Sequence, residues 1–414
     1  MNIIRKKKFR ESFMLIVVFI TMAMFSIKIM VGMISLFEEI PIPNIINRGA
    51  LLFYICLFLY FIFNHKFDKS FLGFGTLQFI ICFIIIDFLL YLYNGGALYD
   101  YLYRDFPLVL SLITYIVSYN LYLKYPRDSI LLQYVAIALV LILCAGYFVI
   151  SNGIRFSLEH FSLRLGIAYI PLLFTPLLLL NKNKVSLICF LVVGYVVIDS
   201  GKRGGLIALL VGLVLFYLVI KQSISKTKNI RIILLLTLAI LFIEAFLPEN
   251  TIVTDMLDRL IHGSEDSDYS SGRVSIYTEV LNKYFNSDPV GLLFGHGLGS
   301  VDKISKEGLS AHNDFIEALF DFGFIGFVSY LMFYIYYLRQ IFLTSKKDKY
   351  VEAVLTYSFL IVLFLSVFSQ IFIYQYLCLF TFTWGAISGS LKQEVIRHHK
   401  LTLSAGCPTK LNCQ

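Results

Sequence analysis

Long apolar segments alternate with short polar ones along most of the chain. A helix rises about 1.5 Å per residue and needs about 20 apolar residues to cross the hydrocarbon core of a bilayer, and most of these segments approach that length. We therefore expect an all-α membrane protein, a polytopic helical bundle of about twelve transmembrane helices with one large extracytoplasmic loop. The predicted spans are residues 12–35, 49–63, 71–93, 106–122, 129–150, 164–180, 185–199, 205–220, 232–247, 314–338, 351–370 and 371–391.

Composition and charge agree with this pattern. Hydrophobic residues make up 58% of the chain, whereas water-soluble domains contain about half or less, so a soluble globular protein is excluded. Lys and Arg gather before residue 12 and then in every second connection, and cytoplasmic loops collect these residues, so we expect the N-terminus in the cytoplasm. The net charge of +8 follows from this asymmetry, and no nucleic-acid partner is expected.

The same orientation divides the chain into parts with different surroundings. We expect residues 1–247 to form about nine spans, residues 248–313 an extracytoplasmic (periplasmic) cap, residues 314–391 the C-terminal spans and residues 392–414 a cytoplasmic tail. The cap segment is longer than the other connections and can carry its own structure. Within it, residues 273–285 are predicted to form a helix with one apolar stripe.

Cysteine spacing gives no sign of a disulfide framework or a zinc site. Five of the seven cysteines lie in predicted spans, and the other two lie in the predicted cytoplasmic tail. Disulfides that stabilise a fold are expected in outward-facing parts, and these parts contain no cysteine.

Cationic residues expected outside the membrane indicate an anion site. Lys202 and Arg203 lie in the sequence GKRGG, where one predicted span ends and the next begins. The first N–H groups and the positive dipole end of a helix favour phosphate there, although a charged anchor at the membrane interface is an alternative. Arg273 opens the predicted cap helix. Its planar guanidinium suits a second phosphate contact, and the alternative is an ordinary surface arginine.

Two histidines are candidates for a general base. His312 lies in SAHND, where the cap re-enters the membrane, and a helix N-terminus disfavours the charged imidazole, which can then accept a proton. The alternative is an interfacial histidine that satisfies a backbone group. His296 lies among glycines in FGHGLG, and we interpret that segment first as a turn that permits close approach of the backbone.

Acidic residues follow His312 on one face of the predicted span. Asp314, Glu317 and Asp321 are spaced i, i+3 and i+7, directly after Asn313. Placing a carboxylate in a bilayer costs free energy, so its presence there favours a supporting role at the site. As alternatives, Asp314 and Glu317 have the spacing of a capping box, and Asp321 could pair with an outer arginine. Asp87, inside another predicted span, requires a buried partner or a polar cavity.

These motifs follow one another in a characteristic order. A middle span begins with KRGG, and a helix in the long outer loop begins with SGR. After this helix come DPVGLLFGHGLGS and then HNDFIEALFDFGFIG, which continues into a span. Over about residues 200–326 this order resembles the superfamily of O-antigen polymerases and O-antigen ligases. In the ligase pattern a histidine is followed by ten residues and a glycine, which His312 and Gly323 fit. The pattern also sets an arginine ahead of a leucine, and here Arg203 is followed at that spacing by Ile207.

The resemblance implies a GT-C-like glycosyltransferase of the inner (cytoplasmic) membrane that needs no metal or nucleotide cofactor. Its donor would be a glycan on undecaprenyl diphosphate, and its active site would face the periplasm. Arg203 and Arg273 would hold the diphosphate, while His312 would take the proton from the attacking sugar hydroxyl. The supporting residues would be Lys202, Asn313, Asp314, Glu317, Asp321 and His296.

We expect an O-antigen polymerase, which joins lipid-linked repeat units, with a ligase that transfers polymer to the lipid A core as the alternative. The expected partners are the lipid-linked donor, the glycan acceptor and membrane lipid; a chain-length regulator leaves no mark in the sequence. A transporter, such as a flippase for the same lipid-linked sugar, is the alternative from another class. Against it stands the crowding of polar residues at one face of the membrane instead of its midplane.

Overall fold

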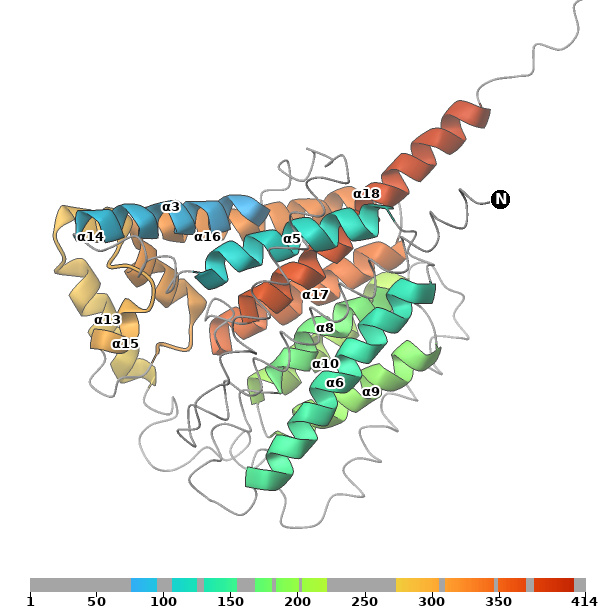
Figure 1. The fold of residues 1–414 in the computed structure, drawn as a ribbon, viewed down its shortest axis with the longest axis horizontal. Helices are drawn as coiled ribbons and strands as arrows, with labels where there is room; N and C mark the ends of the chain where they lie inside the picture. The colour runs from blue at the N-terminus through green and yellow to red at the C-terminus, as the bar shows by residue number, and fades with distance from the viewer. Residues whose placement is uncertain are drawn as a thin grey trace, which may run out of the picture.

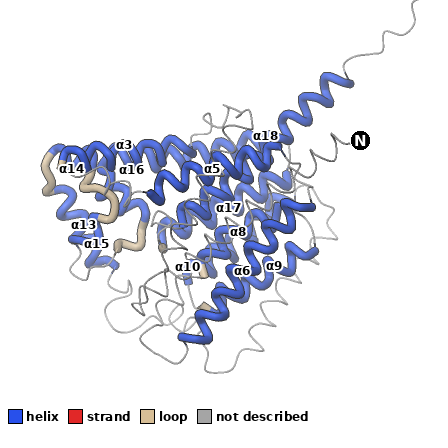
Figure 2. The backbone as a smooth tube through the Cα atoms, in the orientation of Figure 1, coloured by secondary structure: helices blue, strands red, loops and turns tan. Residues whose placement is uncertain are grey.

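The computed structural model describes residues 76–94, 106–124, 130–154, 168–180, 184–200, 203–221, 273–304, 310–345, 349–369 and 376–405. Within these ranges all regular secondary structure is α-helical, which confirms the all-α fold class (Figure 2). The helices before the cap are α3 (Thr76–Tyr93), α5 (Phe106–Lys124), α6 (Ile130–Ile154), α8 (Tyr169–Leu180), α9 (Lys184–Asp199) and α10 (Arg203–Lys221). The cap contains α13 (Arg273–Phe285), α14 (Pro289–Phe294) and α15 (Ser300–Ile304), and α16 (Asp314–Ser345), α17 (Lys349–Phe368) and α18 (Tyr376–Ala405) follow.

Several of these helices have the length and composition of membrane spans. Among the described residues, three stretches are long and apolar enough to cross a membrane: Gly204–Lys221, Asp314–Thr344 and Lys349–Phe368. Shorter apolar helices are Gln78–Tyr93, Leu108–Lys124, Ala136–Val149 and Tyr169–Leu180. All of them coincide with predicted spans. The predicted spans 12–35, 49–63 and 232–247 lie outside the described residues, so the total of about twelve stays a prediction.

Helix α18 packs along α5 through two glycines of the sequence GAISG. A Cβ atom at Gly385 would lie 2.6 Å from the carbonyl oxygen of Tyr115. One at Gly389 would collide with the carbonyl oxygen of Tyr119. Because glycine has no side chain, the two helix backbones can approach this closely, as they do at small-residue interfaces in membranes.

The cap helices surround their own apolar core at one end of the bundle (Figure 1). Helix α13 contributes Ile276, Val280 and Tyr284 at helical spacing, α15 contributes Val301, and Phe320 of α16 packs against them. The apolar stripe predicted for α13, Tyr277, Val280, Leu281 and Tyr284, is confirmed in part, because Ile276 lies in this core and Leu281 does not. Helix α18 projects from the opposite end of the molecule, so the beginning of the predicted cytoplasmic tail is helical.

Helix α16 contains a break that the hydrophobic pattern did not indicate. Gly323 has φ 66° and ψ −170°, a conformation that residues with a side chain rarely adopt. A Cβ atom there would lie 2.5 Å from both the Gly295 nitrogen and the Leu293 carbonyl oxygen. Residues 314–322 thus form a short helix that packs with the cap, and the long apolar helix begins after the break.

Candidate functional site

The C-terminal end of α17 is the point where several candidate segments meet. The carbonyl oxygen of Phe368 accepts a hydrogen bond from Arg273 Nη1 at 3.3 Å, and that of Val367 accepts one from Asn313 Nδ2 at 3.4 Å. The Phe368 side chain also lies against the start of α10, because a Cβ atom at Gly204 would be 2.9 Å from Phe368 Cβ. The starts of α10, α13 and α16 therefore converge on one helix end, which we call the α17 junction.

Arg203 is the first residue of α10, and Lys202 before it lies outside the described residues. The first N–H groups of a helix lack intrahelical partners and lie at the positive end of its dipole. In α10 these groups belong to a turn that includes Gly204 and Gly205, which both pack tightly against neighbouring side chains. The anion site at GKRGG stays a prediction, because the first two residues of this sequence lie outside the described residues.

Arg273 is the first residue of α13, and its side chain is partly buried. Its guanidinium reaches the last turn of α17, whose final carbonyl groups lack intrahelical partners. The negative end of the α17 dipole favours a cation at this position. Arg273 therefore lies at the α17 junction, where it donates a hydrogen bond to a main-chain carbonyl group.

His312 has φ 52°, a left-handed backbone conformation that is uncommon for residues other than glycine. Its side chain is exposed, and the next residue, Asn313, is the N-cap residue of helix α16. Asn313 Oδ1 accepts hydrogen bonds from the N–H groups of Phe315 and Ile316 at 3.0 and 3.2 Å. The alternative of a capping box that begins at Asp314 is therefore wrong, because Asn313 occupies the cap position. Since Asn313 also reaches α17, His312 lies directly beside the α17 junction.

A cluster of buried polar side chains lies between α16 and α17. The hydroxyl groups of Tyr330, Tyr334 and Ser366 form a closed triangle of hydrogen bonds of 2.7 to 2.8 Å. Asp314 is fully buried, and its charge acts on both phenols. Glu317, one turn further along α16, is also buried. The first two acidic residues after His312 thus face the protein interior instead of the surface of the site.

Two other buried carboxylates hold the loop between α14 and α15. Asp321 accepts hydrogen bonds from the N–H groups of Gly299 at 2.8 Å and Ser300 at 3.1 Å. Asp87 Oδ1 of α3 accepts one from the N–H group of Leu298 at 2.7 Å. Backbone amides therefore bind Asp321, so the alternative of an arginine partner is wrong. Asp87 has a hydrogen-bond partner, as expected for a buried carboxylate. Within the described ranges, no group of three His, Cys, Asp or Glu side chains could hold a metal ion.

His296 makes its contacts within the cap. Its ring lies against that of Phe320 with centroids 4.5 Å apart, and Nε2 is hydrogen-bonded to Ser287 Oγ at 2.8 Å. Partial burial lowers the pKa of His296, and the charge of Asp288 opposes this shift. The flanking glycines have φ of 81° and 90°, and the N–H groups of this turn donate to the carbonyl oxygens of Phe320 and Asp321. The interpretation of this segment as a turn with close backbone approach is confirmed.

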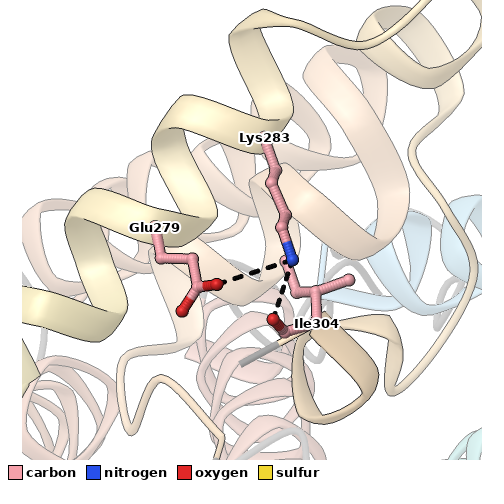
Figure 3. A network of polar contacts seen from close by, with 3 residues as sticks. All are labelled: Glu279, Lys283 and Ile304. Atoms are coloured by element: carbon pink, nitrogen blue, oxygen red, sulfur yellow. Dashed lines mark hydrogen bonds and ion pairs between the residues drawn. The ribbon is translucent and has the colours of Figure 1, made fainter. Parts of the chain in front are cut away.

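Lys283 ties together two helices of the cap (Figure 3). Its Nζ donates to the carbonyl oxygen of Ile304 at 2.8 Å and lies 3.6 Å from Glu279 Oε1. Exposed ion pairs stabilise proteins little, so the contact with the last turn of α15 is the more important one. None of the candidate site residues takes part in this network.

Sequence reasoning missed the part played by α17. Val367 and Phe368 contribute main-chain oxygens, which have no signature in an apolar segment. Tyr169, at the start of α8, was also missed, although its Cε1 would lie 2.9 Å from a Cβ atom at Gly205. Interfacial tyrosines are common in membrane proteins, so nothing distinguished this one. The paired glycines of KRGG were the available signal, because small residues at a helix start indicate close contact with a neighbour.

The family comparison covers the same part of the chain. Residues 187–331 match a family model described as O-antigen ligase. The matched segment runs from α9 through α10 and the cap into α16, and it includes Arg203, Arg273, His312 and Gly323. The comparison with curated proteins gives no match. The match over residues 187–331 confirms the resemblance to the O-antigen polymerase and ligase superfamily, whose members are membrane-associated, glycosyltransferase-like enzymes of polysaccharide biosynthesis.

Proposed function

We propose that this protein is an O-antigen polymerase, a metal-independent glycosyltransferase that joins repeat units carried on undecaprenyl diphosphate at the outer face of the cytoplasmic membrane. The observation that carries the proposal is the convergence of the starts of α10, α13 and α16 at the α17 junction. These starts are Arg203, Arg273 and the segment after His312. The family match supports the enzyme class.

The two arginines bind the diphosphate of the donor. Arg203 acts together with the first N–H groups of α10, while Arg273 adds a planar guanidinium that can contact two phosphate oxygens at once. The leaving diphosphate gains negative charge as its bond to the sugar breaks. Fixed donors that stabilise such charge are typically worth about 3 to 4 kcal/mol each, because they need no reorganisation during the reaction.

His312 acts as the general base. A bond forms between the oxygen of the acceptor hydroxyl and the anomeric carbon of the donor sugar, while the bond from that carbon to the phosphate oxygen breaks. The electron pair of the broken bond leaves with the diphosphate, and the imidazole accepts the hydroxyl proton. An exposed imidazole next to the α17 junction is accessible to an acceptor glycan that arrives from outside the bundle.

Purified protein in lipid, supplied with one lipid-linked repeat unit, tests the proposal. The expected product is a ladder of longer lipid-linked glycans with new glycosidic linkages. A transporter would leave every linkage unchanged, so a reaction that only moves the substrate across the bilayer would overturn the proposal.

An O-antigen ligase is the second candidate, and the description of the matched family favours it. Lipopolysaccharide from cells without the protein separates the two on a gel. Loss of a polymerase leaves single repeat units on the lipid A core. Loss of a ligase leaves a bare core, with polymer retained on the carrier lipid.

A further inference from the structure

Tyr169, the first residue of α8, lies against the first turn of α10 in the proposed diphosphate site. Its hydroxyl oxygen accepts a hydrogen bond from the N–H group of Gly205, and it lies close enough to Arg273 for the guanidinium charge to act on it. A Cβ atom at Gly204 would be 3.4 Å from the same oxygen. The phenol therefore contacts the first turn of α10. Phe368, which packs on the same Gly204, accepts the hydrogen bond from Arg273.

The chemistry of this arrangement suits a phosphate ligand. A phenol oxygen that accepts a hydrogen bond from an amide retains its own proton as a donor. The α17 junction thus combines the first turn of α10, whose Gly205 N–H group bonds the phenol, with a guanidinium from α13 and the phenol of α8. Hydrogen bonds to charged acceptors are stronger than those between neutral groups, above all where little water reaches them, and Tyr169 is buried.

We propose that Tyr169 is a further diphosphate-binding residue, whose O–H group donates to a phosphate oxygen of the lipid carrier between the start of α10 and Arg273. This inference rests on the proposed function and deepens it. Because the donors come from three helices, the site suits two linked phosphate groups better than one. Tyr169 should therefore help the protein to distinguish a polyprenyl diphosphate from the corresponding monophosphate.

A purely structural role for Tyr169 makes a different prediction. If its hydroxyl served only to hold the first turn of α10 through Gly205, its removal would lower thermal stability and weaken every ligand of that turn to a similar extent. The ratio of diphosphate to monophosphate affinity therefore separates the two roles.

Binding of undecaprenyl diphosphate and undecaprenyl monophosphate to the full-length protein in lipid nanodiscs provides the test. We expect Tyr169→Phe to weaken binding of the diphosphate about tenfold and binding of the monophosphate much less. Tyr357→Phe is the matched control, because Tyr357 of α17 is also buried and contacts both α8 and α10. Its hydroxyl is 2.8 Å from Thr175 Oγ1 and its ring packs on Gly212, away from the first turn of α10. This variant should bind both lipids as the wild type does.

Three results would overturn the inference. If Tyr169→Phe binds the diphosphate normally while Arg273→Ala binds it weakly, Tyr169 has no part in binding and the proposed function stands. If Tyr169→Phe loses both lipids equally and its melting temperature falls, the role of Tyr169 is structural. If the wild-type protein binds neither lipid, the proposed function fails together with the inference.

Discussion

Arg273 connects the cap to the bundle through a contact that a ligand can compete for. The bond to the Phe368 carbonyl oxygen, at 3.3 Å, accounts for one of the five N–H donors of the guanidinium. A diphosphate offers a stronger acceptor than a carbonyl group. Under the proposed function, the same side chain would stabilise the end of α17 without substrate and bind phosphate when substrate arrives.

Replacement of Arg273 should slow the reaction far more than it changes stability. We expect Arg273→Ala to reduce the rate of polymer formation by about 10²- to 10³-fold, because a fixed donor for the leaving diphosphate is lost. Arg273→Lys should recover part of this rate, since it retains the charge but not the planar fork. The rate is measured with purified protein, and Lys283→Ala, which disrupts a cap contact outside the site, is the control. A near-normal rate for Arg273→Ala would contradict the assignment.

The two contributions of His312, its backbone conformation and its imidazole, can be separated by substitution. His312→Asn should fold normally, because asparagine tolerates the left-handed region, yet it should form no polymer without the base. His312→Val should in addition lower the free energy of unfolding by about 1 to 3 kcal/mol, because a β-branched residue is strained at this φ. Denaturation and polymer formation are measured on the same preparations. Polymer formation by His312→Asn would exclude the base.

At the scale of single residues, charge and spacing predicted which side chains to consider but not what they contact. Arg273 and His312 stand out because they are polar in an apolar chain. Their neighbours at the α17 junction are a main-chain oxygen and an asparagine cap, and both depend on where the chain folds back. For Asp321 the sequence offered an arginine as partner, whereas backbone amides bind it.

Among the elements, α16 differs most from its predicted form. The sequence around Gly323 is apolar on both sides, so the hydrophobic pattern continues through the break. The reason for the break lies elsewhere in the chain, in the loop at Gly295, whose backbone occupies the space that a side chain would need. Such a contact between two distant glycines leaves no periodic signal in either segment.

Gly323→Ala should destabilise the protein strongly. Its Cβ atom would lie 2.5 Å from backbone atoms of Leu293 and Gly295, and φ of 66° is unfavourable for alanine, so we expect a loss of several kcal/mol. Gly194→Ala in α9 is the control. There the nearest atom, Leu209 Cδ2, is 3.7 Å away, and alanine favours the helix. Thermal unfolding in detergent compares the two variants, and equal melting temperatures would contradict the packing described for the break.

For the molecule as a whole, the apolar segments predicted the described membrane helices well, because the thickness of a bilayer sets their length. They could not predict which helices are neighbours, since lipid and protein present similarly apolar surfaces to a span. The pair α5 and α18 illustrates this limit. Gly385 and Gly389 of α18 indicate a close contact by their spacing, but nothing in the sequence identifies α5 as the partner.

The stability of the folded protein should decrease in mildly acidic solution, partly because of His296. Its pKa in the folded state lies below the ordinary value of 6.5, so below that pH the unfolded chain binds the proton more readily. The free energy of unfolding should therefore fall as the pH falls below about 6.5. In His296→Gln the difference in melting temperature between about pH 7.5 and pH 5.5 should be smaller than in the wild type. His312→Asn, which alters a histidine outside the contact between His296 and Phe320, is the control. An unchanged pH difference in His296→Gln would contradict the prediction.

The joint between the cap and the membrane helices has a consequence for substitutions on the outside of the cap. Main-chain atoms of the cap make several of its contacts, through Gly295, which packs on Gly323, and through the amides that Asp87 and Asp321 bind. These main-chain contacts do not depend on the side chains that cover the outside of the cap. Substitutions on the outside of the cap should therefore leave the packing between the cap and the bundle unchanged.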